Sequence, residues 1–171
     1  MTDMTQPGMT AVVASISANP YFSRFRGMPV GQELEVNDAM ALFSCFEERH
    51  VNKGEILYEA GTQSERMMYL LLEGSVSVRD ASGNIYSTLK AGDVFGLFSF
   101  LEERPHSATV VTQSDSAVLT LKRAYFDLIT IEDPILGNRL LRFMFRLLSR
   151  TSLKLEVEYA ALRDFALGFH F

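Results

Sequence analysis

The segment MMYLLLEGSVSVRDASGNIYSTLKAGDVFG, residues 67–96, determines the fold prediction. It contains short apolar runs separated by glycine-containing turns, and the glycines stand where the backbone often needs a positive φ angle. Residues 75–79 alternate strictly, so Val76 and Val78 are expected to face the core. Short runs bounded by turn residues in this way indicate antiparallel β-strands joined by tight connections.

The same texture continues on both sides of this segment. Short apolar runs alternate with turn signals from about residue 50 to residue 121, which is typical of an all-β sandwich or barrel. We therefore expect strands over Glu55–Tyr58, Met67–Leu72, Ser75–Arg79, Ile85–Leu89, Ser107–Thr112 and Ala117–Leu121.

Helical patterns flank the strands. Asp133-Pro134 is a strong start signal, because Asp caps a helix and Pro suits the first helical position. The long helix that follows is predicted to run to about Arg163. The shorter helices are predicted at Ala11–Ser17, at Asp38–Glu48 with Asn37 as N-cap, and around residues 125–129.

The composition disfavours several classes of protein. The 171 residues carry 21 acidic and 16 basic side chains, a formal net charge of −5, which disfavours binding to nucleic acid or anionic membranes. No apolar run approaches the roughly 18 residues of a membrane-spanning helix, and residues 1–10 lack the features of a secretory signal. Cys45 is the only cysteine, so no intrachain disulfide or cysteine metal cluster can form. We expect a soluble, cytoplasmic protein with no cofactor.

Four motifs occur in order along the chain: Lys53–Gly61, Met68–Gly74, Ala91–Gly96 and Pro105–Val110. Together, at matching intervals, they resemble the cyclic-nucleotide-binding domain family, which includes the bacterial catabolite activator protein and the regulatory subunit of cyclic-AMP-dependent protein kinase. The resemblance covers about residues 38–163.

The resemblance implies a mainly β fold: an antiparallel β-roll (double-stranded jelly roll) of about eight strands, with short N-terminal helices and a long C-terminal helix. We divide the chain into an N-terminal extension (1–37), the roll with its flanking helices (38–132), and the long helix with an apolar tail (133–171).

In this family, residues 95–110 correspond to the phosphate-binding cassette, a short helix and loop on the inner face of the roll. With Gly96 placed on the family's glycine, Leu97 stands where the family has a glutamate for the ribose hydroxyl. His106 stands where it has an arginine for the cyclic phosphate. Leucine accepts no hydrogen bond and histidine near pKa 6.5 is mostly neutral, so we expect ordinary binding of cyclic AMP or cyclic GMP to be lost. The residues assigned to this degenerate cassette are Phe95, Gly96, Leu97, Phe98, Ser99, His106, Ser107 and Ala108.

Two interpretations of the cassette stay open. Its apolar residues Leu97, Phe98, Phe100 and Leu101 either fill a vestigial pocket or re-line it for an apolar ligand or an atypical nucleotide. Arg104 could replace the missing arginine only if the loop were shifted in register. A stand-alone regulatory module that acts by dimerisation or protein docking is the leading interpretation, and a small-molecule sensor is the alternative.

The sharper catalytic and metal motifs are absent from the sequence. The roll also resembles that of the cupin enzymes, but His50, His106 and His170 lack the spacing of a cupin metal site. No GxxxxGK[ST], GxSxG or HExxH pattern occurs. We expect neither catalytic residues nor a metal site, and keep a cupin-type enzyme as a third alternative.

The long helix carries an apolar seam that, with Ser152 included, has alternating spacings of four and three residues, a heptad pattern typical of helix pairing. In the family resembled, this helix pairs with its symmetry mate, so we expect a homodimer; the alternative is a monomer whose last ten residues fold back over the seam. A basic stripe beside the seam is either a solvated face or a docking surface for an acidic protein. The few residues after the helix leave no room for a helix-turn-helix module, so no nucleic-acid partner is expected. The seam comprises Leu141, Phe145, Leu148, Leu155, Tyr159 and Leu162, and the basic stripe Arg139, Arg142, Arg146, Arg150 and Lys154.

Overall fold

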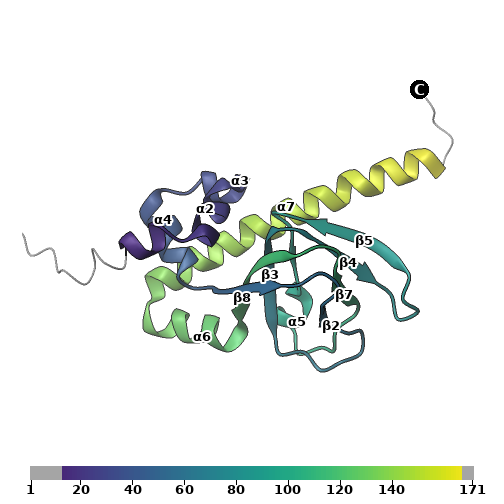
Figure 1. Cartoon of the computed structure of the whole chain (residues 1–171), viewed down its shortest axis with the longest axis horizontal. Helices are drawn as coiled ribbons and strands as arrows, with labels where there is room; N and C mark the ends of the chain where they lie inside the picture. The colour runs from purple at the N-terminus through teal and green to yellow at the C-terminus, as the bar shows by residue number, and fades with distance from the viewer. Residues whose placement is uncertain (1–12, 167–171) are drawn as a thin grey trace, which may run out of the picture.

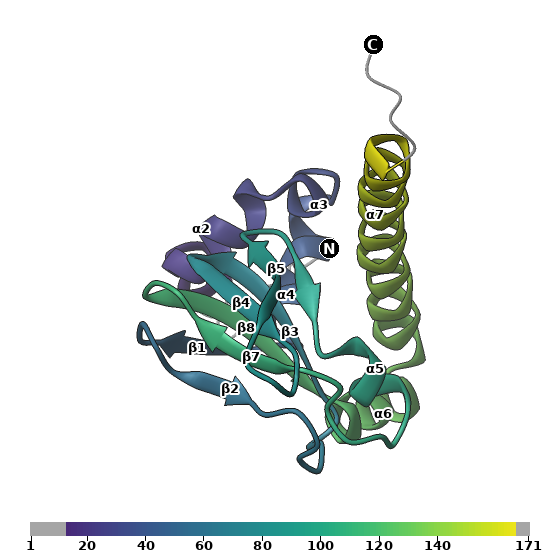
Figure 2. The ribbon, with the colours of Figure 1, turned by 90° about the vertical axis from the view of Figure 1, so that its right-hand side faces the viewer.

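A computed structural model of the chain describes residues 13–166. These residues form two four-stranded antiparallel sheets with helices packed beside them (Figures 1 and 2). One sheet has the strand order β1-β8-β3-β6 and the other β2-β7-β4-β5. The expected antiparallel roll of about eight strands is confirmed. The strands are β1 (Glu47–Val51), β2 (Ile56–Tyr58), β3 (Met67–Glu73), β4 (Ser75–Arg79), β5 (Ile85–Lys90), β6 (Val94–Phe95), β7 (Thr109–Thr112) and β8 (Ser116–Lys122).

The helices lie outside the roll, and α7 runs alongside it and continues past it (Figure 1). Residues 13–17 are also helical, in agreement with the helix expected at Ala11–Ser17, whose first two residues lie outside the described ones. The long C-terminal helix is confirmed. The helices are α2 (Pro20–Gly27), α3 (Pro29–Gln32), α4 (Val36–Phe43), α5 (Leu97–Leu101), α6 (Arg123–Glu132) and α7 (Pro134–Ala166).

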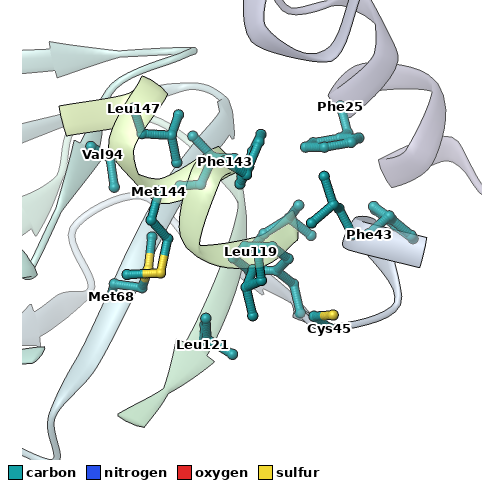
Figure 3. Packing of buried hydrophobic residues seen from close by; sticks show 14 of the residues in the cluster. Phe25, Phe43, Cys45, Met68, Val94, Leu119, Leu121, Phe143, Met144 and Leu147 are labelled. Carbon is teal, nitrogen blue, oxygen red and sulfur yellow. The ribbon is translucent and has the colours of Figure 1, made fainter. Parts of the chain in front are cut away.

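β3 is buried on both faces, which explains why its sequence is an almost continuous apolar run rather than an alternating one. Met68 and Leu70 belong to a large core between the first sheet and the helices. Phe143 and Met144 of α7 belong to the same core, and Figure 3 shows Met68 next to Met144. Tyr69 and Leu71 face a smaller core inside the roll. Val76 is fully buried in that smaller core, and Val78 is partly buried against it, as the alternation of β4 predicts.

The start of α7 is set by a tight corner with α6. The Asp133 carboxylate accepts a hydrogen bond from the backbone N–H of Leu136 at 3.0 Å, so the expected cap is present. A Cβ on Gly137 would lie 2.8 Å from the Cα of Thr130, and glycine therefore allows the two helices to approach closely. From Ser152 to Ala166 every residue of α7 is exposed, so only its first half packs on the roll.

The helix expected at Asp38–Glu48 is wrong at its C-terminal end and shifted at its start. α4 ends at Phe43, its N-cap is Glu35 rather than Asn37, and the chain enters β1 at Glu47. β1 was not expected because four of its five side chains are polar; it forms by antiparallel pairing with β8. The two-residue β6 was also missed. The divisions drawn at residues 37 and 132 stay predictions.

Candidate ligand-binding site in the roll

The backbone of the cassette, residues 95–110, has the expected short helix. Gly96 follows β6 and adopts a φ of +77°, and a Cβ there would lie 2.6 Å from the carbonyl oxygen of Met67. A residue with a side chain would be strained twice at this position, by its φ angle and by the contact. Gly96 is therefore needed to turn the chain from β6 into α5.

The side chains of α5 point in different directions. Phe100 is fully buried in the large core, and Leu97 is partly buried against the same core. Phe98, by contrast, is 79% exposed, and Leu101 is 47% exposed. Leu97, at the position of the family's glutamate, therefore contributes to packing, whereas Phe98 does not fill the site.

Two hollows adjoin the cassette, and Tyr58 and His106 line both of them. The smaller, of about 270 Å³, is lined by Tyr58, Gly96, Leu97, Phe98, Ser99, Arg104, Pro105, His106 and Ser107. The larger, of about 480 Å³, is lined by Arg49, Ile56, Leu57, Tyr58, Glu59, Thr62, Gln63, Glu65, Met67, Tyr69 and His106.

Tyr58 and His106 form a stacked pair, with ring centroids 4.0 Å apart and ring planes 11° from parallel. Burial is the main cause that raises the pKa of Tyr58, and the backbone of Gly96 opposes part of this rise. Burial lowers the pKa of His106. A neutral tyrosine and a neutral imidazole thus form the common wall of the two hollows. Tyr58 was not among the predicted site residues.

The stacked pair is held in place by the loop that follows β2. The backbone N–H of Gly61 donates to the carbonyl oxygen of His106 at 2.7 Å, and the N–H of His106 donates to the carbonyl oxygen of Thr62 at 3.0 Å. Behind the pair, Tyr69 and Phe95 stack with centroids 4.9 Å apart. Four rings from β2, β3, β6 and the cassette therefore gather inside the roll.

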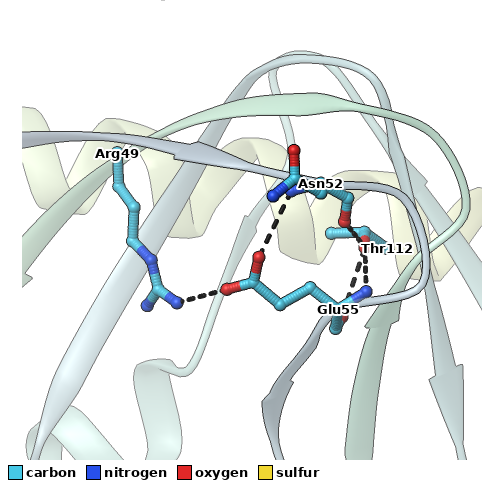
Figure 4. Close-up of polar contacts among 4 residues, drawn as sticks. All are labelled: Arg49, Asn52, Glu55 and Thr112. Carbon is cyan, nitrogen blue, oxygen red and sulfur yellow. Dashed lines mark hydrogen bonds and ion pairs between the residues drawn. The ribbon is translucent and has the colours of Figure 1, made fainter.

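The charges around the larger hollow are unevenly balanced. Arg49 donates to the Glu55 carboxylate at 2.8 Å, and the backbone N–H of Asn52 holds that carboxylate at 3.3 Å (Figure 4). Glu59 and Glu65 line the hollow, and within the described part of the chain neither carboxylate has a hydrogen bond or an ion pair. Burial is the main cause that raises the pKa of the Tyr69 hydroxyl, and the Glu65 carboxylate adds to the rise while Arg49 opposes it.

Of the remaining predicted site residues, Ser107 lines the smaller hollow and Ala108 is buried. Phe95 is buried in the smaller core and Ser99 donates to the Gly96 carbonyl oxygen at 3.0 Å. Their roles in ligand binding stay predictions. His170 lies outside the described residues, and so does the end of the apolar tail, residues 167–171. Over residues 13–166, no group of three or more His, Cys, Asp or Glu side chains is placed to hold a metal ion.

The seam and the basic stripe lie on different flanks of α7. Leu148 of the seam is half-buried, but Phe145, Leu155 and Tyr159 are 63%, 59% and 71% exposed. Three members of the basic stripe form ion pairs with other parts of the chain, so the stripe is not simply a solvated face. The pairs are Arg139–Asp38 at 2.8 Å, Lys154–Asp93 at 3.0 Å, and Arg150–Glu33. None of the helices in the described segment has the length and hydropathy to span a membrane.

Comparisons with known proteins agree with this architecture. Residues 48–132 match the model of the family described as the cyclic nucleotide-binding domain. A solved cyclic nucleotide-binding domain from Methylobacillus flagellatus superimposes with a TM-score of 0.65 at 17% identity, over 88% of this chain and 89% of that one. The catabolite activator protein of Thermus thermophilus gives a TM-score of 0.56 at 24% identity, over 83% and 73% of the two chains.

Two further relatives are larger proteins. The regulatory subunit of a cAMP-independent protein kinase A from Trypanosoma brucei has a TM-score of 0.62 at 23% identity, over 91% of this chain and 53% of that one. Rap guanine nucleotide exchange factor 1 of Caenorhabditis elegans is 31% identical over 81 residues, which are 47% of this chain but only 8% of that protein. The chain therefore spans a small part of the curated relatives it matches. It has the fold of the cyclic nucleotide-binding domain, and its residues 48–132 match that family.

Proposed function

We propose that the chain is a regulatory module with the cyclic-nucleotide-binding fold that does not bind cyclic AMP or cyclic GMP in the ordinary way and acts by pairing α7 with a second copy. The observation that carries the first half of this proposal is the Tyr58–His106 stack. The imidazole stands where the family resembled has its phosphate-binding arginine, and the Tyr58 ring covers one of its faces.

The chemistry of the site disfavours a cyclic phosphate. Leu97 offers no acceptor for a ribose hydroxyl, and a neutral His106 provides one donor in place of a bidentate guanidinium. Each charged hydrogen bond lost is worth about 2 kcal/mol, so the two together weaken binding roughly a thousandfold. The carboxylates of Glu59 and Glu65 add repulsion next to the site.

One relative supports this reasoning. The Trypanosoma brucei regulatory subunit belongs to a cAMP-independent kinase, and a form of it with three substitutions, one of them threonine to arginine, is bound to cAMP. Isothermal titration calorimetry of the present chain with cyclic AMP and cyclic GMP is the direct test. We expect dissociation constants no tighter than high micromolar; a low-micromolar value for either nucleotide would refute the proposal.

The second half of the proposal rests on the pattern of α7. Leu148, Leu155 and Leu162 recur every seven residues, and an apolar or small residue stands three positions before each. Leucine at this heptad position suits parallel two-stranded pairing. The side chains of Leu155 and Leu162 are 59% and 67% exposed, so residues 13–166 leave most of their surface uncovered.

Charge complementarity favours a second copy as the occupant of the seam. Glu158 and Arg163 flank the seam on opposite sides, at the two heptad positions that face each other across a parallel pair. In a parallel dimer, Glu158 of each copy therefore lies opposite Arg163 of the other. A two-fold arrangement provides this pairing twice.

A small-molecule sensor is the second candidate function, and the larger hollow is the observation that favours it. Its volume of about 480 Å³ lies within the usual range of ligand pockets, roughly 300 to 1,000 Å³. A ligand in the larger hollow would contact Tyr58 and His106, which also line the smaller hollow. It could therefore affect the cassette without binding inside it.

A further inference from the structure

The larger hollow combines aromatic walls with carboxylates. Tyr58, Tyr69 and His106 supply rings, and Ile56 and Met67 add apolar surface. An aromatic ring has a negative face that attracts a cation placed within about 6 Å of its centroid. A tyrosine-lined hollow is therefore suited both to a flat apolar group and to a positive charge.

The charged groups of this hollow also favour a positively charged ligand. Glu59 and Glu65 are exposed at its lining, and no cation of the described chain pairs with either of them. Arg49, the only lysine or arginine in the lining, is bound to the Glu55 carboxylate at 2.8 Å. An anion that entered would meet two uncompensated carboxylates, whereas a cation would be attracted by them.

We infer that this hollow is a binding site for an organic cation that carries an aromatic ring, such as an aryl ammonium compound. The ring lies against Tyr58 and Tyr69, and the ammonium group lies toward the carboxylates of Glu59 and Glu65. This inference rests on the sensor candidate and not on the loss of cyclic-nucleotide binding, so the two can fail separately.

The proposed ligand is positively charged, whereas the fold predicts a negatively charged one, a cyclic phosphate. A site for a cyclic phosphate requires net positive charge; the cassette has His106 where the family resembled has an arginine, and its Arg104 is paired with the Glu102 carboxylate. The neighbouring hollow has the opposite balance, two free carboxylates against one arginine that is already paired. The Tyr58–His106 wall separates these two environments, so a cation bound to the larger hollow contacts the rings that close the smaller one.

Three benzyl compounds that differ in charge test the assignment: benzyltrimethylammonium, benzyl alcohol and phenylacetate. Their binding to the full chain is followed by NMR of methionine methyl groups, with Met67 as the reporter in the hollow. We expect the cation to bind about tenfold more tightly than the alcohol, and the anion to bind most weakly. The preference for the cation should shrink as salt is added.

A double variant separates charge from shape. Glu59→Gln with Glu65→Gln keeps the size of the hollow and removes both carboxylates, so the advantage of the cation over the alcohol should fall severalfold while the alcohol binds as before. The control is Glu47→Gln with Glu132→Gln, which makes the same change of net charge at exposed carboxylates outside the hollow. Any of four results would overturn the inference. They are equal binding of the three compounds, a preference for the anion, no shift of the Met67 methyl signal with any compound at about 10 mM, and loss of the preference for the cation in the control variant.

Discussion

The cassette and the second half of α7 are the two regions where the sequence predicts interaction, and they differ in how far their side chains are buried. In the cassette, side chains find partners within the same chain: Tyr58 stacks on His106, and Phe100 enters the large core. In α7 beyond Thr151, every residue is exposed. The cassette, apart from the exposed Phe98 and Leu101, is packed against the rest of the described chain, whereas the second half of α7 contacts the roll through the Lys154–Asp93 ion pair but buries no side chain.

This difference is the reason that our proposal places the interaction surface on the second half of α7. A pocket closed by neutral rings has little to offer a charged nucleotide, while apolar side chains held out in water favour burial against another surface, at about 25 cal/mol for each Å² covered. The chain has counterparts of the cassette and of the long helix of the family resembled, and under our proposal it is the helix that meets a partner. Each of the following experiments changes one of these two regions.

The largest effect is expected from charges placed in the seam. Leu155→Asp with Leu162→Asp puts four carboxylates at the centre of the proposed α7 pair, where unpaired charge is expensive. We expect the dimer to weaken by more than about a hundredfold, and light scattering to show a monomer that retains its β-sheet circular dichroism. Leu155 and Leu162 touch no buried part of the roll, so the fold should survive.

The matched control lies on the same stretch of the same helix. Leu153→Asp with Val157→Asp introduces the same charges at exposed apolar positions outside the seam, and this variant should remain a dimer. If both variants are monomeric, pairing does not use the heptad seam. If the unmodified chain is monomeric at high micromolar concentration, the dimer proposal is wrong.

Most of the roll could be predicted from the sequence because its central strands are marked by local signals, namely apolar runs and turn glycines. A short apolar run such as residues 67–72, bounded by glycine-containing turns, fits a strand covered on both faces, and the turn at position 96 needs a positive φ that glycine adopts readily. β1 was missed for the opposite reason. It is an edge strand whose side chains are mostly polar, and its place depends on hydrogen bonds to β8, more than sixty residues away.

The sequence predicted the backbone of the candidate site, but not all of the side chains that line it. Gly96 and His106 could be located by position along the chain, whereas Tyr58 reaches the cassette only because the loop at Gly61 and Thr62 is bonded to His106. No local signal marks that contact. In the same way, the seam could be read from its heptads, but the boundary at Thr151 between packed and exposed helix depends on where the roll ends.

An intermediate effect is expected from restoring charge to the cassette. Leu97→Glu with His106→Arg supplies the acceptor and the guanidinium that the family resembled uses, and should raise the affinity for cyclic AMP at least tenfold. Adding Tyr58→Ala removes the ring that stacks on position 106 and lines the same hollow, so the triple variant should bind more tightly than the double. Calorimetry gives both values.

Control substitutions must add the same charges elsewhere. Leu101→Glu with His50→Arg does so at exposed positions that line neither hollow, and should leave the affinity for cyclic AMP unchanged. If the double and triple variants bind no better than this control, the backbone of residues 95–110 no longer presents positions 97 and 106 to a ligand. The closed state of the cassette would then reside in its backbone and not in its side chains.

The smallest effect concerns the pH dependence of the stacked pair. Burial lowers the pKa of His106 in the folded chain, so as the pH falls the unfolded chain takes up this proton first. The stabilising contribution is therefore complete above the ordinary histidine value of about 6.5 and is lost as the pH falls below it. An NMR titration should place His106 below that value, and His106→Gln should remove part of the loss of thermal stability between about pH 7 and pH 5. An imidazole that titrates at or above the ordinary value would mean that the ring is solvated and its stack with Tyr58 open. The cassette would then be as accessible as the exposed half of α7, and the contrast between the two regions would not hold in solution.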